Sequence, residues 1–173
     1  MKTGALSIVE LSTAVVVLGV LAALAIPQFS QAGVTNAKAD LKTDLAVLRT
    51  AIELYYRDHD AYPAQKDAGS EAARAGSPSA FIRQLALFTD ADGHANPTRT
   101  TRFRFGPYLR DGIPACSVSI GGPSAKIHVI QGRIVPRFDC SVAAAGWIYN
   151  ADTGYIAANS PGMNERGVRF DAY

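Results

Sequence analysis

The chain has 173 residues, of which 18% are charged, and its formal net charge is +2. This length suits one domain with an appended segment, and so small a net charge gives no reason to expect a polyanionic partner. Hydrophobic residues make up 48% of the chain, as in an ordinary folded protein. The composition therefore favours a folded domain and excludes a strongly basic nucleic-acid-binding protein.

The first distinctive feature is an apolar run, LSTAVVVLGVLAALAI, from Leu11 to Ile26, which Glu10 precedes and Pro27 follows. The stretch around it is long enough to span a membrane, and Lys2 places the N-terminus in the cytoplasm by the positive-inside rule. A cleaved secretory signal is less consistent, because an acid opposes insertion and the helical pattern continues past any cleavage point. We therefore predict a single-pass inner-membrane anchor, with the globular domain in the periplasm.

A carboxylate at the edge of such a run requires a specific partner, because an unpaired charge is costly in an apolar environment. We expect a neighbouring copy to supply this partner. The alternative is a helix N-terminal acid that the macrodipole favours.

The residues from Gly4 to Phe29 resemble the N-terminal segment of type IV pilins and type II secretion pseudopilins. The shared features are small residues, then LSIVEL with its glutamate, an apolar helix, and a proline at a fixed distance from the glutamate. The resemblance implies that a prepilin peptidase cuts between Ala5 and Leu6 and that the new N-terminus is methylated. Cleavage after Gly4 is the alternative, because the family usually has glycine before the cut.

The resemblance also implies roles for Glu10 and Pro27. Glu10 becomes the fifth mature residue and pairs with the N-terminal amine of a neighbouring copy, which neutralises both charges inside a helical filament and sets the axial register. Pro27 becomes the residue that kinks the helix.

Helical periodicity continues beyond the apolar run as far as about Asp58. Steps of three and four residues define one apolar face, formed by Ala37, Leu41, Leu45, Leu48, Ile52 and Tyr55. This spacing predicts one long helix from Leu6, which is a transmembrane and filament-core helix over residues 6–31 and amphipathic over 32–62. Pro63 disfavours helix in the residue before it and so ends the element.

Residues 63–97 are predicted as a variable loop with a helical turn at Glu71–Ala75 and a short helix at Ala80–Phe88, capped near Ser77. The segment from Thr89 to Asn96 contains an Asp-x-Asp-Gly pattern, which is similar to the start of a calcium loop. Major pseudopilins hold calcium in a loop of their C-terminal region. The resemblance therefore implies Ca²⁺, with ligands Asp90, Asp92 and Asn96, and an ordinary turn is the alternative.

Residues 98–173 are predicted as an antiparallel sheet domain with a C-terminal tail. Arginines alternate with aromatic residues from Thr98 to Arg110, which favours a half-buried strand over a nucleic-acid surface. The other predicted strands are Ala125–Ile130, Arg133–Phe138, Gly146–Tyr149 and Tyr155–Ala158. The segment Gly106-Pro107-Tyr108-Leu109 and the hairpin that begins at Trp147 also resemble the major pseudopilins of type II secretion.

The two cysteines, Cys116 and Cys140, lie in the second half of the chain. In an exported domain an even number of cysteines favours one disulfide, so we predict a bond between them. The alternative is a pair of free thiols.

These patterns together predict an α+β pilin fold, with a long, kinked N-terminal helix packed on a small antiparallel sheet. No catalytic set of residues is evident, so an enzyme is not expected. The predicted function is a structural subunit of a type II secretion pseudopilus, stored in the inner membrane and assembled into a helical filament that drives protein export. The expected partners are further copies, other pseudopilins, the inner-membrane assembly platform and prepilin peptidase. A type IV pilus subunit for adhesion, motility or DNA uptake is the alternative, and a membrane-anchored binding module is a third.

Overall fold

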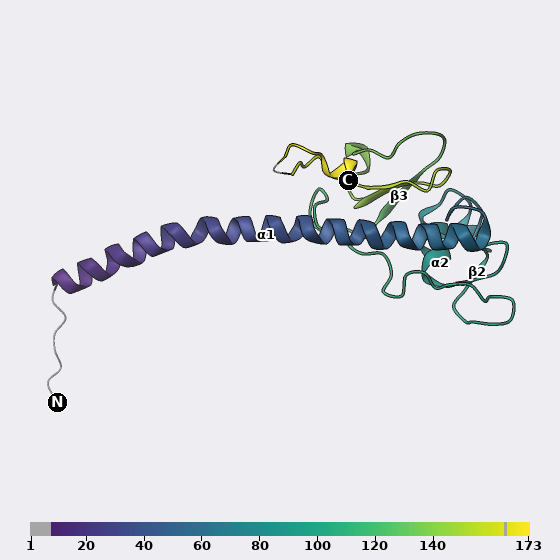
Figure 1. The fold of residues 1–173 in the computed structure, drawn as a ribbon, viewed down its shortest axis with the longest axis horizontal. Helices are drawn as coiled ribbons and strands as arrows, with labels where there is room; N and C mark the ends of the chain where they lie inside the picture. Colours follow the sequence, from purple (N-terminus) through teal and green to yellow (C-terminus); the bar gives the residue numbers. More distant parts are fainter. Residues whose placement is uncertain (1–7, 165) are drawn as a thin grey trace, which may run out of the picture. The chain divides into compact units, whose positions relative to one another are not determined.

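The computed structural model describes residues 8–164 and 166–173, except for the side chains of residues 21–35. The elements in chain order are α1 (Ile8–His59), the 3-10 helix η1 (Glu71–Ala73), α2 (Pro78–Ala86), β1 (Phe88–Thr89), β2 (Ala95–Asn96), β3 (Ile127–Ile130), the 3-10 helix η2 (Cys140–Val142), β4 (Trp147–Asn150), β5 (Ile156–Ala158) and the 3-10 helix η3 (Phe170–Ala172) (Figure 1). The fold is α+β, and the chain divides into two compact units, Met1–Ala37 and Lys38–Tyr173.

The predicted membrane anchor over residues 6–31 is contradicted. Among the residues that the structure describes, no helix combines the length and the apolar character that crossing a membrane requires. This finding also contradicts the predicted single-pass inner-membrane location, with a cytoplasmic N-terminus and a periplasmic domain.

The predicted long helix is confirmed over the described residues, because α1 has 52 residues and ends at His59, one residue beyond Asp58. Asp60 leaves the helix at φ +49, where its N–H still donates to the carbonyl oxygen of Tyr56 at 2.8 Å. This left-handed residue just after the last turn is a common helix stop.

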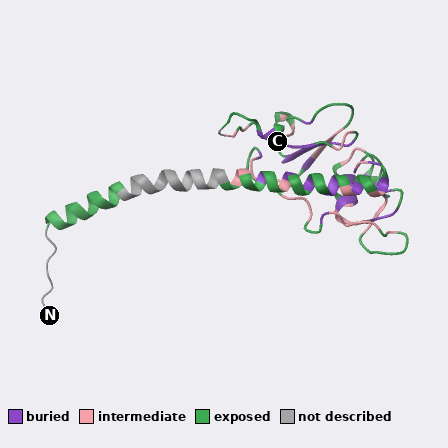
Figure 2. Ribbon diagram, viewed as in Figure 1, coloured by how far each residue is buried: buried purple, intermediate pink, exposed green. Residues whose placement is uncertain are grey.

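The predicted apolar face of α1 is buried in the second unit, as Figure 2 shows along the C-terminal part of the helix. Its spacing of three and four residues keeps the side chains on one side of the helix. Five of the six predicted positions are at most 2% exposed, and Ala37 is half-buried: the five are Leu41, Leu45, Leu48, Ile52 and Tyr55.

The core of the second unit forms where α2 and the larger sheet meet this face. α2 is capped as predicted, with the Ser77 hydroxyl accepting from the N–H of Ala80 at 3.1 Å, but it begins and ends two residues earlier than the predicted Ala80–Phe88. The ring of Phe81 lies 4.3 Å from that of Tyr149 in β4. Trp147 is fully buried, and its indole N–H donates to the carbonyl of Pro114 at 2.8 Å.

The predicted hairpin of β4 and β5 is confirmed, with Tyr149 opposite Ile156 in an antiparallel pair. The prediction of a wholly antiparallel sheet is wrong, because β3 pairs with β4 in parallel and the sheet order is β3-β4-β5. The predicted strand Arg133–Phe138 does not form, so β3 has no hairpin partner directly after it. Within that segment Ile134 and Val135 are each 62% exposed, and Pro136 has no N–H to donate to a ladder.

The C-terminal tail is held more firmly than a surface segment would be. Phe170 is 7% exposed and belongs to the core. The Arg169 guanidinium donates to both oxygens of Asp171 at 2.9 and 2.7 Å, and the N–H of Phe138 donates to the same carboxylate at 2.9 Å. Asp171 therefore ties η3 to the segment that was predicted as a strand.

Candidate functional site

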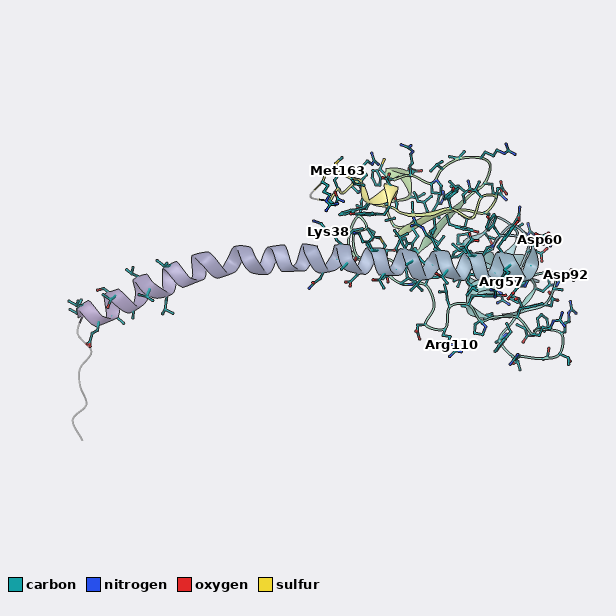
Figure 3. All side chains as sticks on the ribbon, viewed as in Figure 1. Lys38, Arg57, Asp60, Asp92, Arg110 and Met163 are labelled. Atoms are coloured by element: carbon teal, nitrogen blue, oxygen red, sulfur yellow. The ribbon has the colours of Figure 1, made fainter. Side chains whose placement is uncertain are left out.

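The first candidate site is the start of α1, from Ile8 to Val20, where large apolar side chains face solvent. Every one of these side chains is at least 56% exposed: Ile8, Val9, Leu11, Val15, Val16, Val17, Leu18 and Val20. Positions 15–18 are consecutive, and at 3.6 residues per turn they face every direction around the helix. Figure 3 shows side chains projecting from this part of α1 on more than one side. The segment is therefore apolar all round rather than amphipathic.

The hydroxyl groups in this segment are already satisfied within the helix. Ser12 Oγ donates to the carbonyl of Val9 at 2.9 Å, and Thr13 Oγ1 lies 2.9 and 3.0 Å from the carbonyls of Val9 and Glu10. A hydroxyl that donates to its own backbone adds little to the cost of burying the surface around it. Glu10 lies in the exposed first turn, where the helix dipole favours a carboxylate.

Three of the predicted site residues in this region are not tested by the structure. Ala5 and Leu6, the predicted cleavage and methylation positions, lie outside the described residues. The side chain of Pro27 lies outside them too, so its role as a kink stays a prediction.

The second candidate site is the turn that joins β1 to β2, which contains the Asp-x-Asp-Gly pattern. Phe88 lies opposite Asn96 in this short antiparallel pair. Asp90 is 3% exposed, and its Oδ1 accepts from the backbone N–H groups of Asp92 at 3.1 Å and His94 at 3.0 Å. Its Oδ2 lies 3.1 Å from Nδ1 of His94. Figure 3 shows Asp92 at the same end of the domain as Asp60, the residue that follows α1.

Arg102 completes the surroundings of Asp90 from a different loop. Its Nε donates to Asp90 Oδ2 at 2.9 Å, and its Nη2 lies 2.8 Å from the same oxygen. Burial alone would raise the pKa of the Asp90 carboxyl, but the hydrogen bonds from His94 and Arg102 outweigh it and hold the pKa below its usual value.

The turn is also packed tightly against the core. Gly93 has φ +90, and a Cβ at this position would lie 2.6 Å from the hydroxyl oxygen of Tyr55. Gln84 is fully buried, and its amide nitrogen donates to the carbonyl of Gly93 at 3.1 Å while its Oε1 accepts from the N–H of Ala64 at 2.6 Å. Gln84 therefore joins α2 to this turn and to the preceding loop.

The predicted calcium ligands do not fit a calcium site. Asp90, Asp92 and His94 bring one ligand atom each to within 4.8 Å of one another, but calcium prefers a shell of six to eight oxygens. Both oxygens of Asp90 already accept N–H groups, and one of them faces a guanidinium. The third predicted ligand, Asn96, already accepts through its Oδ1 from the N–H of Thr98 at 2.8 Å.

The predicted strand from Thr98 to Arg110 is wrong. Its one bridge among the described residues joins Phe105 to Thr89, and the rest of the segment is loop. Alternating arginines and aromatics here do not mark two sheet faces, because the exposed Arg102 pairs with Asp90 and Arg104 lies over the ring of Phe105 at 4.9 Å.

The Gly106-Pro107-Tyr108-Leu109 segment holds α1 and α2 together. The backbone N–H groups of Tyr108 and Leu109 both donate to the carbonyl of Leu85 at 2.9 Å. The Tyr108 hydroxyl donates to the carboxylate of Asp58 at 2.9 Å, and Leu109 is buried.

The sequence did not indicate that His59 is buried. His59 is 7% exposed, and its ring stacks on that of Tyr55 with centroids 4.1 Å apart. Its Nδ1 lies 3.0 Å from the carbonyl oxygen of Tyr55, and its Nε2 lies 3.0 Å from that of Asp90. Of the three aromatic residues around His59 (Tyr55, Phe105 and Tyr108), only Tyr55 lies close in the sequence, one helical turn before it, so it was the one local signal of this packing.

The predicted disulfide is not formed, because Cys116 and Cys140 are both free. Cys116 is buried at 0% exposure, and Cys140 begins η2 as an exposed residue. Burial raises the pKa of the Cys116 thiol and so disfavours its reactive thiolate form.

The chain matches no known protein-family model, no curated protein and no solved structure.

Proposed function

We propose that this chain is a structural subunit that assembles through the start of α1 into a helical filament, in the manner of a type II secretion pseudopilin. The observation that carries the proposal is the surface from Ile8 to Val20, which is apolar in every direction and exposed. An apolar surface of this extent on a protein in water marks an interaction site. A helix that is apolar all round is suited to burial among other helices.

The energetics favour association of several copies through this surface. Burying one Val, Leu or Ile side chain contributes about 1.5–3 kcal/mol, whereas association costs on the order of 4–15 kcal/mol in lost freedom of motion. Burial of several of these side chains offsets that cost. A filament core also brings Glu10 of one copy near its neighbours, where the N-terminal amine would be the countercharge that the resemblance implies.

The second candidate is a subunit of a type IV pilus, which shares the N-terminal features. Two segments favour the pseudopilus because they resemble its major subunits: Gly106-Pro107-Tyr108-Leu109 and the hairpin that begins at Trp147. Their contacts with Leu85, Asp58 and Pro114 give these segments a role in building the domain.

Assembly can be tested with a matched pair of charge substitutions on α1. Val16 is 65% exposed within the apolar segment, and Val47 is 46% exposed in the second unit. We expect Val16→Lys to abolish filaments in electron micrographs of the full chain after detergent dilution, because each buried copy would carry an unpaired charge. Val47→Lys should leave filaments intact. Filaments of normal length and number from Val16→Lys would refute the proposed interface.

A test of the proposed role of Glu10 in setting the axial register requires a variant that keeps the shape of the side chain and loses its charge. Glu10→Gln removes the charge alone, so it should reduce filament yield, whereas Ser12→Ala should not.

Mass spectrometry of the mature N-terminus tests cleavage and methylation at Leu6. Loss of protein export from cells that lack the chain would favour the pseudopilus, and loss of long surface filaments with export intact would favour the pilus.

A further inference from the structure

The Asp90 turn contains a buried negative charge that needs a positive partner. The side chain of Asp90 is 4% exposed, and a buried ion is stable only if it is paired and hydrogen-bonded. The neutral backbone donors of Asp92 and His94 occupy Oδ1, but they bring no net charge. The countercharge must approach Oδ2.

Arg102 supplies this charge at Oδ2 with two nitrogen atoms of one guanidinium, at 2.9 and 2.8 Å. A charge-assisted contact of this length is among the stronger hydrogen bonds in proteins. A divalent ion bound to Oδ2 would have to lie beside this permanent positive charge or displace it. The Arg102 guanidinium therefore occupies the direction from which a cation would bind.

The loop that carries Arg102 is organised to present it. The N–H of Thr100 donates to the carbonyl of Phe103 at 3.2 Å, and the N–H of Phe103 donates back to Thr100 Oγ1 at 3.1 Å. This closed turn places Arg102 next to the ring of Phe103, 5.3 Å from its centroid. A side chain that is positioned in advance loses less freedom when it pairs.

We propose that Arg102 is an internal cation that replaces a divalent metal in the Asp90 turn, so that the folded domain is independent of calcium. The proposal rests on the contacts of Asp90 and does not depend on the function proposed above. It assigns Arg102 a positioning role: the guanidinium holds the turn, and the turn holds the end of α1 through the contact between the Asp90 carbonyl and His59.

The test measures thermal unfolding of the full chain in a nonionic detergent, with EDTA or with millimolar calcium chloride. The wild-type melting temperature should be the same in both solutions. Arg102→Ala should lower it by about 3–8 °C, because it removes the permanent positive charge beside a buried carboxylate and leaves the His94 ring as the side-chain partner of Oδ2. The matched control is Arg104→Ala, because this arginine is exposed like Arg102 and contacts the Phe105 ring but no carboxylate of the described residues, and its loss should change the temperature much less.

Arg102→Lys keeps a positive charge but offers one nitrogen atom, so it should recover part of the loss, and it remains measurable if Arg102→Ala does not fold. Calcium titration of the wild-type chain by calorimetry should show no binding heat. A rise in the wild-type melting temperature with calcium would overturn the proposal. Equal losses from Arg102→Ala and Arg104→Ala would overturn it too.

Discussion

At the residue scale, two buried carboxylates link segments of the domain that are separate in the sequence. Asp90 joins the β1–β2 turn to the loop that contains Arg102, and Asp171 joins η3 to the segment after β3. Burial raises the pKa of the Asp171 carboxyl, but the hydrogen bonds from Arg169 and from the N–H of Phe138 outweigh it and lower the pKa overall. The pKa of Asp90 is lowered in the same way.

These lowered pKa values predict a loss of stability in acid. A group with a lower pKa in the folded state stabilises the protein fully above its unfolded pKa of about 3.9, and this contribution disappears as the pH falls through the folded value. We therefore expect the urea midpoint to fall steeply below a pH of about 4. Asp171→Asn should be less stable than wild type at neutral pH, and its stability should change less with acidification.

The control for this prediction is Asp111→Asn, at an exposed carboxylate. It should keep both the wild-type midpoint and the wild-type acid dependence. An acid dependence that is the same in Asp171→Asn as in wild type would show that other carboxylates cause the loss.

At the scale of elements, the β1–β2 turn depends on a glycine for two separate reasons. The φ of +90 at Gly93 disfavours any residue with a side chain, and a Cβ there would lie 2.6 Å from the hydroxyl oxygen of the buried Tyr55. Gly121 has a similar φ of +80, but a Cβ there would meet no atom within 4 Å. Substitutions at the two positions therefore distinguish the cost of backbone strain from the cost of a steric clash.

Alanine substitutions at both glycines should differ in their cost. Gly121→Ala should lower the free energy of unfolding by about 1–2 kcal/mol, which is the price of a left-handed conformation. Gly93→Ala should lower it by about 2–4 kcal/mol, because the core around Tyr55 must also shift. Urea unfolding of the two variants measures the difference, and equal losses would mean that Tyr55 moves aside freely.

Local sequence patterns correctly predicted the elements that depend on residues close together in the sequence. The apolar spacing of α1, the Ser77 cap of α2 and the polar turn between β4 and β5 each act over a few residues, so their sequence was sufficient. The parallel pairing of β3 with β4 depends on the connection between Gln131 and Gly146, and no short-range pattern specifies its path. The alternation of arginines and aromatics from Thr98 to Arg110 predicted a strand wrongly, because Arg102 in this segment pairs with the carboxylate of Asp90.

The same distinction applies to the candidate sites. The turn at Asp90 and the apolar start of α1 were both located from the sequence. The partners of Asp90 were not, since Arg102 lies on another loop and His94 was not considered as a contact. Gln84 was missed because a polar residue on a short helix gives no sign of being fully buried until its acceptors at Gly93 and Lys66 are in place.

At the scale of the whole molecule, the two compact units have different physical characters. All members of the described hydrophobic core lie between Leu41 and Phe170, within the second unit. The described side chains of the first unit are exposed from Ile8 to Val20 and at Asn36, and Ala37 is half-buried. The second unit therefore contains the contacts that stabilise the fold, and the exposed apolar segment of the first unit is suited to association.

This division predicts that residues 38–173 fold without the first unit. The fragment keeps every described core residue, and its new helix end lies before Leu41, so the expected loss is confined to fraying of the first turn. It should be monomeric by size-exclusion chromatography without detergent, and it should melt within about 5 °C of the full chain in detergent. The full chain, which keeps the apolar segment, should associate when detergent is diluted. A fragment that is unfolded would place part of the domain's stability in the first unit, and a fragment that still associates would place the assembly surface in the second.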